Sequence, residues 1–230
     1  MSAGPFEQDI GAEGAPAHSL WILAMDLSCA HGHLALCEGK RLVGQEAFSG
    51  DRSHHGALFA PLQRLLGLIP SEARVQLVVG IGPGSYTGVR IAIAAAQGLG
   101  LARGWPLLGL PSIASAGHDR YGVVGDARRG QAYLAQVSDG HLLGQPLLLE
   151  PQVAASMMTA SQPWLSFDAQ VPFGLAGVEL ARPDAQRLAK IVASMSASER
   201  GVLNAGPLQP YYLQEAFITQ AKGRGKTLQG

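Results

Sequence analysis

The chain has 230 residues, of which 47% are hydrophobic and 15% are charged. This composition excludes a disordered polymer and allows one domain or two small lobes. The 17 Lys and Arg residues balance the 17 Asp and Glu residues. Proteins that bind nucleic acid by themselves normally carry an excess of basic residues, so this balance disfavours that class. Two cysteines are too few for a disulfide framework, and we find neither a long apolar run nor a signal peptide. We therefore expect a cytoplasmic protein with no membrane association.

The first half of the chain predicts a compact α/β lobe over residues 20–110. Residues 1–19 are rich in Gly, Ala, Pro and acidic residues, and we expect a disordered leader there. Alternating or continuous apolar runs predict four strands, and apolar residues at helical spacing predict two helices. In chain order these elements are expected at 20–27, 33–37, 42–48, 54–69, 75–81 and 87–103.

A second α/β lobe is expected over residues 111–216. Short β-rich runs predict strands at 122–127, 132–137, 142–149 and 164–167. Pro151 opens a short helix, and Pro183 opens a longer helix that ends at Gly201. Residues 217–230 contain three basic residues among glycines, and we expect a mobile basic tail there.

A glycine-rich turn, GIGPGSYTGVR at residues 80–90, joins the buried strand to the second helix. It contains no lysine, so it is not a P-loop, and Thr87 stands where the Rossmann fingerprint needs its third glycine. Two interpretations remain open. In the first, the turn holds an anion on backbone N–H groups at the helix N-terminus. In the second, its glycines only allow a tight turn and a close helix–sheet approach. The candidate phosphate or nucleotide region comprises Asp26, Ser28, Gly82, Gly84 and Ser85.

Two aspartates close strands in successive lobes. Asp26 could bind a metal or orient a water molecule, or it could simply cap a turn. Asp126 closes its strand in the same way, which indicates a duplicated architecture. The histidines show no pair at i and i+4, and Cys29 and Cys37 are not a close-spaced metal pair. We therefore predict no metal and no cofactor.

The helix over 87–103 is apolar nearly all round, with Arg90 its only charge before Arg103. A helix without a polar face must be covered on every side. The sheet covers one side, and either other helices of the chain or a partner covers the other.

Three segments together resemble the bacterial TsaB (YeaZ) family. They are ILAMDLS at 22–28, GPGSYTGVR at 82–90, and Asp126-Ala127-Arg128 with Tyr133. Order and spacing agree from about Leu20 to about Leu213. The resemblance implies an α/β, two-lobed actin-like, sugar-kinase and Hsp70-like ATPase (RNase H-like) fold. It also implies a part in making N6-threonylcarbamoyladenosine in tRNAs that read codons beginning with A.

In that family, also called M22 glycoprotease-like, the chemistry belongs to a paralogue, TsaD, which holds a metal with His-x-x-x-His. Those histidines align with Ser112 and Ala116 of this chain, and neither side chain can replace imidazole as a ligand. The resemblance therefore implies a non-catalytic subunit. It pairs directly with TsaD, is joined by the ATPase TsaE, forms a homodimer when alone, and meets tRNA only indirectly.

The resemblance places the partner interface on the helices at about 54–69 and 87–103. Two features depart from the family pattern: Gln131 replaces a glutamate and Gln214 replaces an arginine. The alternative functions are a small-molecule kinase or ATPase of the same fold and, least favoured, a metalloprotease. The expected interface residues are His55, Leu58, Leu62, Leu66, Arg90, Ile91, Ala94, Ala95 and Gly98.

Overall fold

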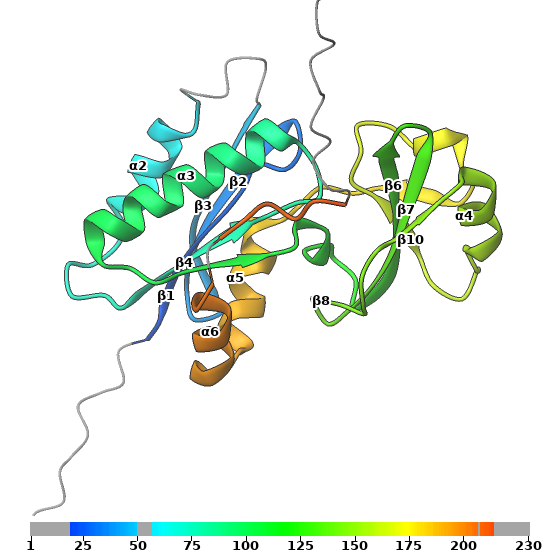
Figure 1. The fold of residues 1–230 in the computed structure, drawn as a ribbon. Coiled ribbons are helices and arrows are strands. Elements are labelled where there is room, and N and C mark those ends of the chain that lie inside the picture. The colour runs from blue at the N-terminus through cyan, green and yellow to red at the C-terminus, as the bar shows by residue number, and fades with distance from the viewer. Residues whose placement is uncertain (1–18, 50–56, 207, 214–230) are drawn as a thin grey trace, which may run out of the picture.

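The computed structural model describes residues 19–49, 57–206 and 208–213, which form two lobes with one β-sheet each (Figure 1). The first sheet has the strand order β3-β2-β1-β4-β5. The first three strands form an antiparallel meander, and β4 and β5 are added in parallel to β1. The strand bounds are β1 (Trp21–Asp26), β2 (His31–Glu38), β3 (Arg41–Ser49), β4 (Val75–Gly80) and β5 (Leu107–Leu110).

The second sheet repeats this arrangement. Its order is β11-β10-β6-β7-β8, with β9 also paired to β7. Strands β6 and β7 are antiparallel, whereas β10 and β11 are parallel to β6. The repeat confirms the duplicated architecture and the two-lobed, actin-like α/β fold. The strand bounds are β6 (Arg120–Arg128), β7 (Gln131–Ser138), β8 (His141–Leu142), β9 (Leu147–Leu149), β10 (Trp164–Ser166) and β11 (Val178–Leu180).

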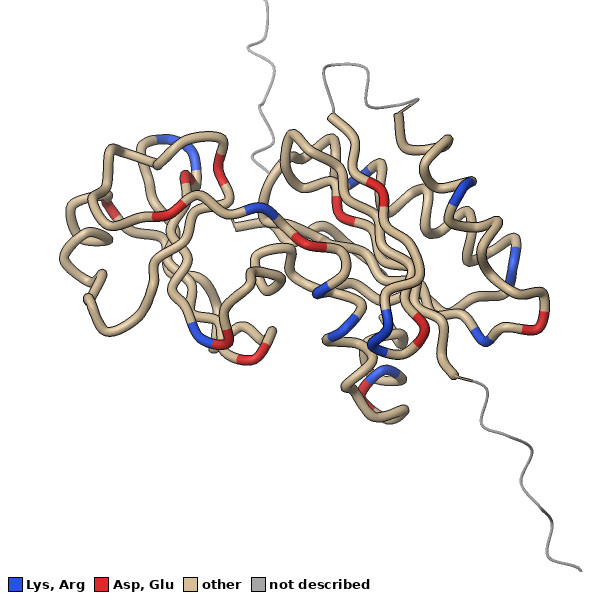
Figure 2. Tube along the Cα trace, turned by 180° about the vertical axis from the view of Figure 1, so that it is seen from behind, with Lys and Arg blue, Asp and Glu red and all other residues tan. Residues whose placement is uncertain are grey.

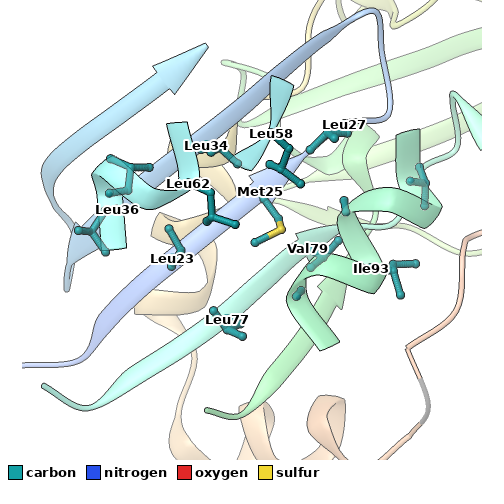
Figure 3. Packing of buried hydrophobic residues seen from close by; sticks show 14 residues of the cluster. Leu23, Met25, Leu27, Leu34, Leu36, Leu58, Leu62, Leu77, Val79 and Ile93 are labelled. Atoms are coloured by element: carbon teal, nitrogen blue, oxygen red, sulfur yellow. The ribbon is translucent and has the colours of Figure 1, made fainter. Parts of the chain in front are cut away.

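One face of the first sheet is covered by α2 (Phe59–Leu66) and α3 (Tyr86–Arg103). Strand β4 is buried at all six positions, as its continuous apolar sequence predicts for a strand covered on both faces. Figure 3 shows Leu62 of α2 near Leu23 of β1, and Ile93 of α3 belongs to the same buried cluster as Leu77 and Val79 of β4. This shared core fixes which side of each helix faces inward.

The opposite face of the first sheet is covered by α5 (Ala185–Ser194), which contacts β1, β2 and β4. Leu188 and Val192 pack on Ile22 and Val78, which alternate with the residues that face α2 and α3. This helix is expected in the second lobe at 111–216 from the sequence, and that prediction is wrong. The first half of the chain places α2 and α3 on the other face, so the chain returns after β11 to cover this one.

Several boundaries also differ from the sequence expectation. The helix expected from Pro183 to Gly201 is two helices, α5 and α6 (Ala197–Asn204), because Ser196 and Glu199 form a capping box that starts α6. The strand expected at 142–149 is divided into β8 and β9. The remaining helix, α4 (Pro151–Met157), begins at Pro151 as expected.

Both cysteines are free in the structure, Cys37 buried and Cys29 half-buried. Among the helices described, none has the length and apolar content needed to span a membrane. The expected leader at 1–19 and tail at 217–230, apart from Ser19, lie outside the described residues, as do residues 50–56.

The packing of α5 predicts that Leu188→Ala destabilises the protein. Leu188 is fully buried, so its truncation should lower the free energy of unfolding by about 2–5 kcal/mol through lost burial and a residual cavity. Urea unfolding measures this change. The matched control is Leu203→Ala on the outer side of α6, where the leucine is exposed, and it should have little effect. Equal stability of the two variants would contradict the placement of α5.

Candidate functional site

A cleft of about 820 Å³ lies between the two lobes. The first lobe contributes residues 28–31 and the glycine-rich turn, and the second contributes the ends of β6 and β10. A C-terminal segment, 210–213, lines the remaining side. The size suits a small organic ligand.

The glycine-rich turn is pressed against the end of β1. Ser85 N donates to Ser28 O at 2.6 Å, and Ser85 Oγ caps α3 by accepting from Gly88 N at 3.2 Å. A Cβ placed on Gly84 would lie 2.2 Å from Ser28 O, and one on Gly88 would lie 1.9 Å from Leu27 O. Both glycines are therefore required for close packing of backbone on backbone.

Asp26 is buried below the cleft, with only 1% of its surface exposed. Its Oδ1 accepts from Ser28 N at 2.8 Å and Ser28 Oγ at 2.6 Å, whereas Oδ2 makes no hydrogen bond within the described chain. A Cβ on Gly80 would lie 1.7 Å from Oδ2. Burial raises the pKa of Asp26, and the Ser28 and Ser112 hydroxyls oppose that shift.

The five residues of the predicted phosphate region thus fall into two groups, three that line the cleft and two that do not. Ser28, Gly84 and Ser85 line the cleft. Asp26 is enclosed, and Gly82 N donates to Ser112 Oγ at 2.9 Å. Neither Asp26 nor Gly82 is among the residues that line the cleft.

The second-lobe wall carries two carboxyl groups, Asp126 at the end of β6 and Asp168 just after β10. Asp126 occupies the place in the second sheet that Asp26 occupies in the first. Asp126 N donates to Asp168 Oδ2 at 2.8 Å. Burial raises the pKa of Asp168, and the charge of Asp126 raises it further.

Asp168 is not among the site residues predicted from the sequence. In the sequence, Asp168 is marked only by its position after a short strand. That position indicates a site only when β10 is known to lie parallel to β6.

Tyr133 of β7, one of the residues that carry the family resemblance, lies in the same wall. Its ring packs over Gly125, where a Cβ would lie 2.3 Å from a ring carbon. Burial raises the pKa of Tyr133, with a further contribution from Asp168. The glycine in β6 therefore makes room for the tyrosine beside Asp168.

The predicted partner interface is also divided. Leu58 and Leu62 are buried in the core under the first sheet's helices, so they are unavailable to a partner, and this part of the prediction is wrong. The reason is that the apolar stripe of α2 faces its own sheet. Leu66, Ile91 and Ala95 are half-buried against the same core, and His55 lies outside the described residues.

The outer face of α3 is exposed at Arg90, Ala94 and Gly98. Two exposed apolar residues are not among the predicted interface residues: Leu101 on this helix, which is 88% exposed, and Phe59 on α2, which is 59% exposed. No apolar helix of the described chain covers either residue. Exposed large apolar residues could be found only after the direction of each helix was known.

Arg90 contacts Tyr86 one helical turn earlier. Its guanidinium donates to the Tyr86 hydroxyl and lies 5.1 Å from the centre of that ring. Tyr212, from the C-terminal segment, packs against Tyr86 with ring centres 6.1 Å apart. These contacts hold the Arg90 side chain at the N-terminus of α3. The expected role of Arg90 as an anchor at a partner interface stays a prediction.

The same C-terminal segment joins the lobes. Tyr211 N donates to Ile81 O at 2.8 Å, and its hydroxyl donates to Gln145 Oε1 at 2.6 Å. Figure 1 shows the segment crossing from the first lobe toward the second.

A sequence-family model described as TsaD, tRNA N6-adenosine threonylcarbamoyltransferase, matches residues 63–158. An uncharacterized protein of Mycobacterium tuberculosis is 32% identical over 146 residues, which cover 60% of this chain and 63% of that protein. The chain thus spans less than two thirds of that relative's length. The Escherichia coli protein named tRNA threonylcarbamoyladenosine biosynthesis protein TsaB is 28% identical over 162 residues, 60% of this chain and 70% of the relative.

Solved structures agree with these matches. The structure of YeaZ from Pseudomonas aeruginosa superposes with a TM-score of 0.63 at 25% identity and covers 83% of this chain and 99% of its own. A second structure from that organism, described as similar to the peptidase YeaZ, gives a TM-score of 0.65 at 26% identity, with 84% and 99% covered. The glycine-rich turn and the repeated lobes agree with these similarities, which together support a TsaB-like (YeaZ-like) protein.

Proposed function

We propose that the chain takes part in forming N6-threonylcarbamoyladenosine in tRNA, as a non-catalytic subunit. It binds and activates a TsaD-type transferase, and the ATPase TsaE joins the resulting pair. The name of the E. coli relative supports the pathway. The exposed outer face of α3 is the observation that carries the proposed subunit role.

That face has the properties of a docking surface. Ala94 and Gly98 are exposed small residues, which allow the backbone of a second helix to come close. Leu101 adds an exposed apolar side chain, and Phe59 adds another from α2 on the same side of the sheet. We propose that these exposed side chains belong to one interaction site, because exposed apolar patches often mark such sites.

The positions of the paralogue's metal histidines serve structural roles in this chain. Ser112 is fully buried and its hydroxyl accepts from Gly82 N. Ala116 N donates to the Tyr121 hydroxyl at 3.2 Å. Over residues 19–49, 57–206 and 208–213, no group of three His, Cys, Asp or Glu side chains could hold a metal. These contacts favour a reactive centre on the partner and disfavour a metalloprotease.

Without its partner, the same α3 face would pair two copies of the chain. Contact with tRNA would be indirect, since Figure 2 shows basic and acidic residues interspersed along the described chain. A surface that binds a nucleic-acid backbone directly normally gathers Lys and Arg on one face.

We predict that Ala94→Arg abolishes pairing with the TsaD-family transferase of the same organism. The new charged side chain would project from an exposed position, so the monomer should stay folded while a close helix–helix contact is blocked. Co-elution in size-exclusion chromatography measures pairing. Ala155→Arg, the same change at an exposed position of α4 on the second lobe, is the control and should pair normally.

A reconstituted modification assay with TsaD and TsaE extends this test. Activity should depend on the chain and be lost with Ala94→Arg but retained with Ala155→Arg. Full tRNA modification in the absence of the chain would refute the proposed role. Binding of ATP and magnesium by the isolated chain in calorimetry would instead favour the kinase or ATPase alternative.

We predict that Asp26→Asn retains the ability to support tRNA modification, because Asn can still accept from Ser28 while the carboxylate has no role in chemistry.

The raised pKa of Asp26 means that the folded state binds its proton more tightly than the unfolded state does. The stability of the wild-type protein should therefore fall as pH rises above about 4, the ordinary value for Asp, until the folded-state pKa is passed.

Urea unfolding at a series of pH values measures this dependence. The Asp26→Asn variant should lack the fall, so its stability relative to wild type should increase with pH. Asp119→Asn, at an exposed position, serves as the control for removing a carboxylate. A catalytic Asp26 would instead give an inactive variant of normal stability.

A further inference from the structure

The two carboxyl groups of the second-lobe wall differ in how far the protein satisfies them. Asp126 Oδ1 accepts from Arg128 N at 2.7 Å, and its Oδ2 lies 3.6 Å from the Arg128 guanidinium. Asp168 Oδ2 accepts from Asp126 N, but its Oδ1 accepts no hydrogen bond from any residue that the structure describes. One oxygen of this cleft-lining carboxyl group therefore has no donor among the described residues.

Tyr133 presents a second unused polar group at the same place. Only 3% of this residue is exposed, and its hydroxyl has no hydrogen-bond partner among residues 19–49, 57–206 and 208–213. Its ring tip lies over Gly125, next to the Asp126 N–H that binds Asp168. Tyr133 and Asp168 also interact electrostatically and both line the cleft.

Two carboxyl groups, Asp126 and Asp168, and two arginines, Arg128 and Arg182, line the cleft. Arg128 forms an ion pair with Asp126, and its charge also favours the ionised form of Asp168. The other cleft-lining arginine, Arg182, is exposed and forms no ion pair within the described part of the chain. A carboxylate that is partly buried beside another carboxylate favours a bound positive charge.

We propose that this wall binds the protonated amino group of a small organic molecule, with Asp168 Oδ1 and the Tyr133 hydroxyl as acceptors and the rest of the molecule in the cleft. An ammonium group has three N–H donors, enough for both acceptors. The neighbouring Phe167 also lines the cleft, and aromatic faces attract organic cations.

The same residues disfavour other ligands at this wall. A divalent cation such as Mg²⁺ or Ca²⁺ needs six or more oxygen ligands in defined geometry, and the described residues offer no group of three acidic, His or Cys side chains. An anion placed at Asp168 would meet the carboxylate of that residue. The two acceptors without donors, Asp168 Oδ1 and the Tyr133 hydroxyl, therefore fit an amine best.

Calorimetric titration of the full chain tests the site with two matched pairs of probes: tyramine against tyrosol, and n-butylamine against n-butanol. Each pair keeps the carbon skeleton and replaces the amine by a hydroxyl. At least one amine should show saturable binding. The matching alcohol should bind roughly tenfold or more weakly, which corresponds to a difference in binding free energy of about 1.4 kcal/mol. Failure of both amines to saturate, or equal binding of amine and alcohol, would overturn the proposal.

Variants locate the binding. Asp168→Asn keeps an acceptor for Asp126 N–H, and Tyr133→Phe keeps the ring, so both should fold, which thermal melts will verify. Each should weaken amine binding roughly tenfold or more. Asp139→Asn, which removes an exposed carboxylate outside the cleft, should bind like wild type. Wild-type affinity in both cleft variants would overturn the assignment, whatever the outcome of the tRNA modification assay.

Discussion

The backbone of Leu27 and Ser28 lies so close to Gly84 and Gly88 that no side chain fits between them. This contact brings the N-terminus of α3 directly against the end of β1, where Ser85 binds Ser28 through its N–H and caps the helix through its hydroxyl. The direction of α3 across the sheet follows from that start. The glycines are therefore required first of all to place the start of α3. A ligand can bind only on the part of the turn that this contact leaves exposed.

Once α3 is held in this way, only one of its sides reaches the sheet. Val89 and Ile93 enter the core, whereas Ala94 and Leu101 face outward. The sequence alone indicates that the helix lacks a polar face, but it does not indicate what covers the outer side. Helix α5, the other large covering helix, packs on the opposite face of the sheet, so it leaves the outer side of α3 exposed at Ala94, Gly98 and Leu101.

Local patterns predicted β1, β4 and α3 well, because continuous burial and helical spacing leave a direct trace in sequence. They failed for α5, since its contact with β1 joins segments more than 150 residues apart. They also misassigned Leu58 and Leu62, because an apolar stripe shows that a helix packs but not on which surface. The split between α5 and α6 was readable in Ser196 and Glu199, whose capping-box spacing is local.

The equivalent strand ends of the two lobes have acquired different environments. Asp26 is enclosed by Gly80, so its position could be predicted from the strand but its burial could not. Asp126 opens onto the cleft, and Asp168 joins it only because β10 lies beside β6. The cleft and the α3 face meet at Tyr211 and Tyr212, which line the cleft while Tyr212 packs on Tyr86. A displacement of this segment would therefore alter both surfaces at once, although each is built from different residues.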